Sequence, residues 1–360
     1  MKIIAYYLPQ YHPIEENDEW WGKGFTEWTN VGKAQPLYRG HYQPKVPADL
    51  GYYDLRLPQV LESQQKLALE AGITGFCYWH YWFGGGKKLL EKPLEELIYR
   101  GGGNFPICLG WANESWKAKV WSNSSTGKDR VLIEQTYPEG DDVTSHFEYV
   151  FQAIKETKYI THNGRPVFII YKPLLLKNAK NFIKKWNELL SKKGFSSKFY
   201  FIGHAIDASE TKSILELGFD AVNIVRIGEH RYNKAVIRRI FLKLISFKII
   251  KGPLRIKYKF ISRYFIGKEE LSEDVIPTLI PNWDHTPRSG RNGVVFDDAS
   301  PDLFYKHALH TIEMVKHKKN KIIFLKSWNE WGEGNYMEPD LRYGQKYIKA
   351  LRRALFNNGF

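Results

Sequence analysis

Residues 321–334 read KIIFLKSWNEWGEG, and this stretch carries the pattern on which the fold prediction depends. Its first part, Lys321–Trp328, is an apolar run rich in β-branched and aromatic residues, which predicts a buried strand. Polar side chains follow at once, among them Asn329, Glu330 and Glu333. Apolar runs that end in polar and aromatic side chains recur along the chain.

Seven earlier runs of this kind bring the expected number of strands to eight. They are Lys2–Leu8, Ile73–Trp82, Phe105–Trp111, Pro166–Lys172, Lys198–His204, Phe219–Val225 and Val275–Pro281. Stretches with helical periodicity lie between most of them or after the last: Leu57–Ala71, Ser145–Lys155, Asn178–Lys192, Thr211–Leu217, Asp302–Lys318 and Tyr343–Leu355. This alternation predicts an α/β fold, a (β/α)8 TIM barrel.

The residues beyond a minimal barrel fall into three places. Long loops follow the first strand, at about Pro9–Arg56, and the third strand, at about Ala112–Glu139, and a basic insert at 229–274 follows strand six. No linker rich in Pro, Gly or Ser divides the chain, so we expect a single domain over residues 1–360. A two-domain or doubly wound arrangement is the alternative.

The 360 residues include 12 Trp, 22 Tyr and 21 Phe, many of them at the ends of the expected strands. Barrel enzymes build their sites at these carboxyl ends, where aromatic faces and polar groups suit sugar rings and hydroxyls. Packing in the core is the alternative for any one aromatic residue. The predicted substrate-binding residues are Tyr7, His12, Trp28, Tyr78, His80, Trp111, Asn113, Glu114, Trp283, Asp284, Arg288, Asn329 and Trp331.

Glu330 and Glu333 are the predicted catalytic residues. Glycoside cleavage uses two carboxyl groups, one as acid and one as base or nucleophile, and repulsion between neighbouring carboxylates keeps one protonated. The prediction requires their oxygens to face a hollow and to be free of buried ion pairs. Glu114 is a second candidate acid that could pair with Glu330, or else a ligand for sugar hydroxyls. Arg288 could hold an anionic group or orient Asp284.

The net charge of +14 is concentrated in one segment, because residues 231–268 contain twelve Lys and Arg and no Asp or Glu. Apolar and aromatic residues are interspersed there, which favours contact with an anionic membrane surface; a solvated helical hairpin is the alternative. Nucleic acid is not an expected partner. Neither a cofactor nor a metal is expected, because phosphate-binding and metal-ligand motifs are missing.

Two cysteines inside apolar runs, and a first strand where a secretory signal would stand, favour a cytoplasmic location. Association with the inner face of the membrane through the basic segment is part of this expectation.

Several long motifs resemble the WbsX-like family of bacterial polysaccharide and lipopolysaccharide biosynthesis proteins, which is related to glycoside hydrolase family 99. The motifs are YYLPQYHP, NDEWWGKGFTEWTNV, HYQPKVPADLGYYDL, GITGFCYWHYWF, LGWANESW, NWDHTPR and SWNEWGEGNYMEP. They extend over nearly the whole chain except the basic insert. The resemblance implies a (β/α)8 barrel that acts on glycosidic bonds.

Family 99 enzymes are retaining endo-acting α-mannosidases and mannanases with two glutamates in an Asn-Glu-Trp-x-Glu-Gly frame, which residues 329–334 match. The resemblance implies that Glu330 deprotonates the 2-hydroxyl of the sugar, which attacks C1. It implies that Glu333 protonates the leaving oxygen and then serves as base. Mannose specificity is not implied, because the match to family 99 itself lies mainly in this frame.

We therefore expect a retaining glycoside hydrolase or transglycosidase that acts on a bacterial surface polysaccharide or its lipid-linked precursor. A glycosyltransferase of O-antigen or capsule biosynthesis is the alternative enzyme, and a non-catalytic glycan-binding protein is the alternative without chemistry.

Overall fold

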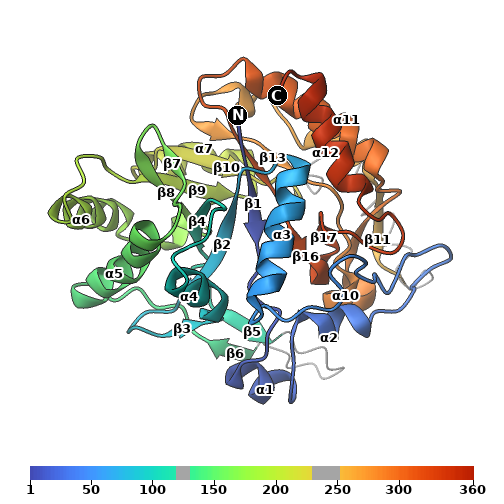
Figure 1. Cartoon of the computed structure of the whole chain (residues 1–360), viewed down its shortest axis with the longest axis horizontal. Coiled ribbons are helices and arrows are strands. Elements are labelled where there is room, and N and C mark those ends of the chain that lie inside the picture. Colours follow the sequence, from blue (N-terminus) through green and yellow to red (C-terminus); the bar gives the residue numbers. More distant parts are fainter. Residues whose placement is uncertain (119–129, 229–251) are drawn as a thin grey trace.

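The computed structural model describes residues 1–118, 130–228 and 252–360, and all eight expected strands lie within these ranges (Figure 1). They form a parallel sheet in the order β12-β10-β9-β8-β4-β2-β1-β15-β13, which confirms the (β/α)8 barrel. The strands are β1 (Lys2–Tyr7), β2 (Gly75–Trp82), β4 (Ile107–Trp111), β8 (Arg165–Ile170), β9 (Tyr200–Ala205), β10 (Ala221–Ile224), β12 (Val275–Ile276), β13 (Thr278–Leu279) and β15 (Ile322–Leu325).

The seventh strand differs from the expected continuous run, because Pro277 divides it into β12 and β13. Proline has no N–H to donate, so it interrupts a ladder of backbone hydrogen bonds. On one side of Pro277, β12 pairs with β10, and on the other side β13 pairs with β15. The seventh strand thus pairs first with β10 and then with β15, and this change of partner closes the sheet into a barrel.

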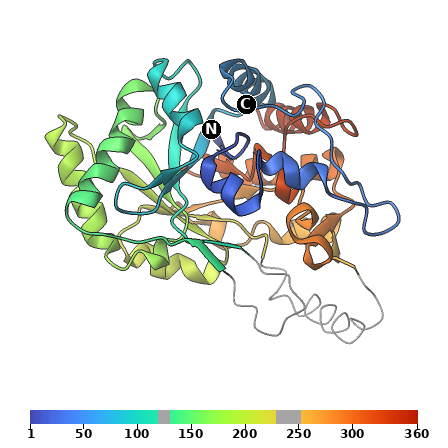
Figure 2. The same ribbon diagram turned by 90° about the horizontal axis from the view of Figure 1, so that it is seen from below.

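Helices surround the barrel (Figures 1 and 2). Those after the strands are α3 (Pro58–Ala71), α4 (Lys92–Tyr99), α5 (Asp141–Glu156), α6 (Ala179–Lys192), α7 (Thr211–Glu216), α11 (Pro301–Lys316) and α12 (Lys346–Asn357). All but α4 were expected from periodicity. Helix α12 packs against both α11 and α3, which places the last helix of the ring beside the first.

Inside the barrel, side chains fill the space, as in other folds of this class. The ring of Tyr6 stacks on Trp79 with a centroid distance of 4.7 Å and on Phe324 at 5.0 Å. The Tyr6 hydroxyl donates a hydrogen bond of 2.7 Å to Asn223 Oδ1, so the one polar group of the ring is satisfied in the core. The barrel is a packed core, and any site must lie above it.

Short elements in the connections complete the chain. They are α1 (Glu15–Trp21), α2 (Glu27–Gly32), β3 (Lys88–Leu89), β5 (Trp116–Ala118), β6 (Arg130–Ile133), β7 (Thr161–His162), β11 (Leu254–Lys257), α9 (Tyr258–Ile261), α10 (Thr286–Ser289), β14 (Val294–Asp297), β16 (Asn329–Glu330), the 3₁₀ helix η7 (Trp331–Glu333) and β17 (Asn335–Tyr336). Helices α1 and α2 belong to the long first loop, and β16, η7 and β17 form the turn after the last strand.

Candidate active site

The turn after β15 is fastened to the first strand by Asn329. This side chain is fully buried, its Oδ1 accepts a 2.8 Å hydrogen bond from the Leu8 N–H, and its Nδ2 donates a 3.0 Å bond to the Leu8 carbonyl. One amide therefore satisfies both backbone groups at the end of β1, which would be costly to leave unpaired. Asn329 lies in the framework that positions Glu330, beneath the surface where substrate binding was predicted.

Trp331 fastens the same turn from a second side. Its indole is buried, stacks on Tyr336 with a centroid distance of 3.8 Å, and donates a 2.6 Å hydrogen bond to Glu338 Oε2. The Trp331 backbone N–H donates to the Tyr11 hydroxyl at 3.1 Å, and that hydroxyl donates to the Asn329 carbonyl. Trp331, also predicted to bind substrate, is thus part of the core that supports the turn.

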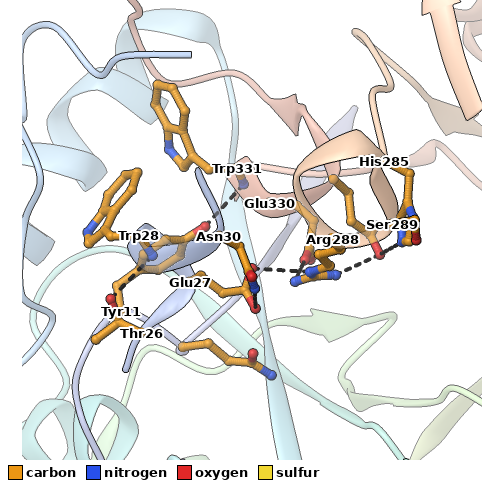
Figure 3. Close-up of polar contacts among 12 residues, drawn as sticks. Tyr11, Thr26, Glu27, Trp28, Asn30, His285, Arg288, Ser289, Glu330 and Trp331 are labelled. Carbon is orange, nitrogen blue, oxygen red and sulfur yellow. Dashed lines mark hydrogen bonds and ion pairs between the residues drawn. The ribbon is translucent and has the colours of Figure 1, made fainter. Parts of the chain in front are cut away.

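Arg288, in α10, joins three glutamates, of which Figure 3 labels Glu27 and Glu330. Its Nη2 lies 2.7 Å from Glu330 Oε1, its Nη1 lies 2.7 Å from Glu333 Oε1, and its Nε lies 3.1 Å from Glu27 Oε2. The expectation that Glu330 and Glu333 are free of buried ion pairs is therefore wrong for this structure. The planar fork of five guanidinium donors explains why one arginine can hold three carboxylates.

The two predicted catalytic carboxyls have pKa values displaced in opposite directions. Burial raises the pKa of Glu330 to about 7, although Arg288 opposes this, and the charge of Glu333 adds to the rise. For Glu333 burial is outweighed by Lys326, Arg288 and His285, which together lower the pKa to about 2. The two carboxyls titrate as a coupled pair, in which burial favours the protonated form of Glu330 and the neighbouring cations favour the ionised form of Glu333.

Glu27 is a member of the site that the sequence prediction missed. The hydroxyl of Thr26 caps α2 by accepting a 3.2 Å bond from the Trp28 N–H, and this places Glu27 in the first turn, buried against Arg288. A side chain at position 332 would collide with the Glu27 carboxylate and approach Arg288 Nε to 2.9 Å, so Gly332 is required by close packing. The Glu-Trp pair occurs at 19–20, 27–28 and 330–331, so this dipeptide by itself does not single out Glu27.

The open side of the site, its mouth, is next to Glu333. The Glu333 side chain is 16% exposed and that of Arg288 24%, whereas that of Glu330 is only 6% exposed. Lys326 Nζ lies 3.7 Å from Glu333 Oε2 and 5.8 Å from the centre of the half-buried Trp283 ring. Trp283 thus lies near Lys326, which contacts Glu333, and its role in substrate binding stays a prediction. Lys326 is a second member of the site that the sequence prediction missed.

Glu114 faces the same mouth from the end of β4. Its neighbour Asn113 is fully buried, and the Asn113 amide donates to the Lys172 carbonyl at 3.0 Å and accepts from the Lys172 N–H at 2.7 Å. Burial raises the pKa of the half-buried Glu114, with Lys172 opposing and Glu333 adding to the rise. Glu333 is therefore near enough to Glu114 to influence its charge.

Asp284 is buried and holds a loop instead of facing the mouth. Its Oδ2 accepts a 2.7 Å hydrogen bond from Gln43 Nε2 and lies 2.9 Å from His41 Nε2, and its N–H donates to the Glu333 carbonyl at 2.7 Å. Burial opposes ionisation, but the contact with His41 and the other partners lower the pKa of Asp284. Arg288 contacts the three glutamates, so it does not serve to orient Asp284.

The remaining predicted ligands pack mainly in the interior. They are Tyr7, His12, Trp28, Tyr78, His80 and Trp111, of which only Trp28 is half-buried and the others are buried. The Tyr7 hydroxyl donates to Gln64 Oε1 at 2.7 Å, and His80 Nε2 lies 2.7 Å from His146 Nε2. Alternate side chains of a strand point to opposite faces, and when both faces carry aromatic residues the sequence cannot tell core from mouth.

The basic insert is only partly described, because residues 229–251 lie outside the described ranges. In the described part, Arg255 and Lys257 contact Asp297 at 2.7 and 3.0 Å across the β11–β14 ladder. In the described ranges we find no helix with the length and apolar character that a membrane crossing requires.

The fold and the site define a class: a (β/α)8 barrel with a cluster of carboxyl groups around an arginine at the carboxyl ends of its strands. The sequence matches the family described as Glycosyltransferase WbsX over residues 3–351. The chain belongs to this family.

Two sequence relatives are the uncharacterized proteins WxcX of Xanthomonas campestris pv. campestris, from strains ATCC 33913 and B100. Each is 33% identical to this chain over 359 residues, which is 98% of this chain and 49% of the relative. The chain therefore spans about half the length of the curated relatives it matches.

Two solved structures have the same fold. The first is the GH99 endo-alpha-mannosidase from Bacteroides thetaiotaomicron in complex with BIS-TRIS-Propane, with a TM-score of 0.58, 15% identity, and coverage of 99% of this chain and 97% of that chain. The second is described as a glycoside hydrolase-like protein, with a TM-score of 0.58, 13% identity and coverage of 98% and 93%. At these identities the likeness establishes the barrel.

Proposed function

We propose that this chain is a retaining glycoside hydrolase or transglycosidase in which Glu330 and Glu333 perform the chemistry. The ion pairs with Arg288 depart from the expectation from sequence, but Arg288 and Glu333 are 24% and 16% exposed at the open side of the site, so a substrate can displace the guanidinium. The observation that carries the proposal is the closeness of the two carboxyls around this displaceable guanidinium, with pKa values displaced in opposite directions. Such a pair supplies one protonated and one ionised carboxyl near neutral pH, which glycoside cleavage requires. The family and the GH99-like fold support a substrate with glycosidic bonds.

The resemblance to family 99 implies the acid role for Glu333, whereas in the ligand-free site burial favours the protonated form of Glu330 and cations favour the ionised form of Glu333. Arg288 and Lys326 are the cations that hold Glu333 ionised. A sugar that enters between the carboxyls must displace the Arg288 contact, and loss of a nearby cation raises the pKa of a carboxyl. We infer that the shared proton then passes to Glu333, which leaves Glu330 ionised and ready to act as base.

The proposed reaction then has two steps. In the first, Glu330 removes the proton of the 2-hydroxyl, O2 bonds to C1, and the bond from C1 to the leaving oxygen breaks as Glu333 protonates that oxygen. In the second, Glu333 removes a proton from water or an acceptor hydroxyl, whose oxygen attacks C1. The bond from C1 to O2 breaks in this step, and O2 recovers its proton from Glu330. Two inversions at C1 give net retention.

The experiment is a screen of the purified chain against defined bacterial surface polysaccharides, with the anomeric configuration of the first product read by NMR. We expect the α or β configuration of the substrate to be retained. Glu333→Gln should lower turnover by about 10²- to 10⁴-fold, the usual contribution of a general acid–base group, while glycan binding persists. Glu62→Gln, at an exposed position of α3, is the matched control; cleavage by Glu333→Gln at the wild-type rate contradicts the assignment.

Glycosyl transfer is the second candidate, favoured by the name of the family. A transferase needs an activated donor, so product should form only when a nucleotide-activated or lipid-linked sugar is added, with little hydrolysis. If neither cleavage nor transfer occurs but Glu330→Ala and Glu333→Ala variants still bind glycan, the chain is a binding protein.

We also propose that the substrate is a surface polysaccharide precursor carried on lipid in the cytoplasm and that residues 231–268 contact the anionic membrane surface. The support is the twelve Lys and Arg without Asp or Glu in this segment. Flotation with vesicles containing anionic lipid should recover the chain at low salt and release it at high salt. Failure to bind at low salt removes this part of the proposal.

A further inference from the structure

A pocket of about 380 Å³ lies outside the mouth, between α5 and α6, which run side by side in Figure 1. Its floor consists of four buried side chains, Trp111, His146, Leu176 and Phe182. Trp111 ends β4, and residue 176 follows β8, so the pocket opens at the same end of the barrel as the glutamates. Its volume falls in the range of small-molecule sites with an apolar, aromatic lining.

The rim of this pocket mixes donors and acceptors without a net charge. Lys177, Asn181 and Lys185 supply N–H donors, and Glu139 and Asp142 supply carboxylate oxygens. Asp142 already accepts from Trp82 Nε1 at 3.3 Å and from the Gly86 N–H at 3.1 Å, and Glu139 accepts from Asn178 Nδ2, so a ligand would use their remaining acceptor capacity. Across the part of the chain that the structure describes, the side chains of Lys177, Asn181 and Lys185 have no hydrogen bond or ion pair. Two cations balanced by two carboxylates favour a neutral ligand, and hydroxyl groups can use both the donors and the acceptors.

Tyr137 connects this pocket with the mouth. Its ring forms a wall of the pocket, its hydroxyl donates a 2.8 Å hydrogen bond to the Asn113 carbonyl, and the Asn113 amide donates back at 3.1 Å. Glu114, the next residue, faces the mouth and is influenced by Glu333. Tyr137 therefore links the lining of the pocket to the residue that precedes Glu114.

We propose that the pocket between α5 and α6 is a second saccharide-binding subsite, which holds a neutral sugar unit of the same glycan whose scissile bond lies at Glu330 and Glu333. This inference depends on the proposed function and specifies the substrate class. The enzyme acts on an oligomer or polymer that reaches both places, and the pocket contributes to binding without taking part in bond cleavage.

The direct test measures binding without turnover, in the Glu333→Gln protein. The probes are the methyl glycosides of α-D-glucose, α-D-mannose and α-D-galactose, with methyl β-D-glucuronide as the anionic comparison. The reporter is the NMR signal of the Trp111 indole N–H, which donates to the Trp82 carbonyl at 2.9 Å beneath the pocket; Trp111→Phe assigns this signal. At least one neutral glycoside should shift it saturably, and the glucuronide should bind no more tightly.

Asn181→Trp, at an exposed position of α6, places a large side chain at the opening and should abolish the shift. Lys185→Ala removes one donor and should weaken binding about twofold to tenfold, the range expected for one hydrogen bond. Lys184→Ala, the exposed neighbour that does not line the pocket, is the matched control and should bind like the parent protein.

In the active enzyme, Asn181→Trp should raise KM for a long substrate about tenfold or more and leave kcat within about twofold, because binding energy remote from the reacting bond is lost. The inference is overturned if none of the glycosides shifts the Trp111 signal, if the shift persists in Asn181→Trp, or if the glucuronide binds more tightly than every neutral probe. Saccharide binding in a protein without turnover would leave the subsite standing and count against the proposed reaction alone.

Discussion

Two Asn-Glu pairs, Asn113-Glu114 and Asn329-Glu330, follow β4 and β15, and their asparagines make the same pair of hydrogen bonds although only Asn329-Glu330 lies in a strand. Each asparagine is fully buried and exchanges two hydrogen bonds with a single residue of a neighbouring strand segment. Asn113 does so with Lys172 at 2.7 and 3.0 Å, and Asn329 with Leu8 at 2.8 and 3.0 Å. The same dipeptide thus forms the same clamp between adjacent barrel strands.

The two glutamates differ in their surroundings. Glu330 is buried and ion-paired to Arg288, with Glu27 and Glu333 on the same guanidinium. Glu114 is half-buried, and Lys172 acts on it electrostatically but lies beyond ion-pair distance in the described contacts. The dipeptide therefore determines the position of the carboxyl group, while residues distant in sequence determine its charge and its capacity for chemistry.

The largest expected difference between the two pairs is in turnover. Glu330→Gln should lower kcat about 10³-fold, because it removes the proposed base of the reaction, whereas Glu114→Gln should lower kcat/KM about tenfold or less by removing a sugar ligand. The measurement is initial rates on whichever polysaccharide the wild-type chain cleaves. Equal losses for both variants would mean that Glu114 belongs to the reacting pair.

Removal of the cation beside each Asn-Glu pair should lower the unfolding free energy of the protein by different amounts. Arg288→Met leaves three carboxylates without their shared partner and should cost about 3–5 kcal/mol of unfolding free energy, as for other broken buried ion pairs. Lys172→Met, the matched change beside Glu114, should cost about 1 kcal/mol or less. Urea unfolding at pH 7 measures both, and a loss for Arg288→Met no larger than for Lys172→Met would refute the role given to Arg288.

Removal of either asparagine clamp should lower the unfolding free energy by the same amount. Asn113→Ala and Asn329→Ala each leave a buried backbone N–H and carbonyl without partners, and each should cost about 2–3 kcal/mol. Urea unfolding of the two variants is the measurement. A difference of more than about 1 kcal/mol between them would show that the two clamps are not equivalent.

The smallest expected effect is in the dependence of stability on pH. The pKa of Glu330 is about 7 when folded and lies at its ordinary value of 4.5 when unfolded, so the folded chain binds more protons between these values. Its contribution to stability therefore falls as pH rises from 4.5 to 7.

The unfolding free energy of Glu330→Gln, measured relative to that of wild type, should accordingly rise by about 1–3 kcal/mol between pH 5 and pH 8. The relative unfolding free energy of Glu114→Gln should rise over the same range by a smaller amount, because Glu114 is half-buried. Thermal or urea unfolding across this range is the measurement, and parallel curves for Glu330→Gln and wild type would contradict the raised pKa.

Much of the fold could be predicted from sequence because each barrel strand is a local signal. The runs around Lys2–Leu8 and Lys321–Trp328 contain their own β-branched and aromatic residues, and their order along the chain specifies the parallel sheet. The division of the seventh strand was available in Pro277 but depends on which neighbour each half meets. Helix α4 was missed because only two turns of periodicity mark it.

The site was predicted less completely. Glu330, Glu333 and Glu114 were found through their positions at strand ends, and their catalytic and binding roles stay predictions. Glu27 and Lys326 were missed because nothing in their local sequence states that they meet Arg288 and Glu333. His80 and Trp111 were assigned to the mouth because they end strands, but His80 is buried beside His146, and Trp111 forms the floor of another pocket.

The alternation of strands and helices and the placement of Asn-Glu pairs at the carboxyl ends could be predicted from the sequence, because these depend on neighbours within a few residues. The tertiary structure determined which backbone groups the two asparagines clamp, which aromatic side chains face the interior, which three carboxyls share Arg288 and in which direction each pKa moves. Charge and burial at a point in space depend on every group around it. Those groups come from loops that are hundreds of residues apart along the chain, as Glu27 and Glu330 are.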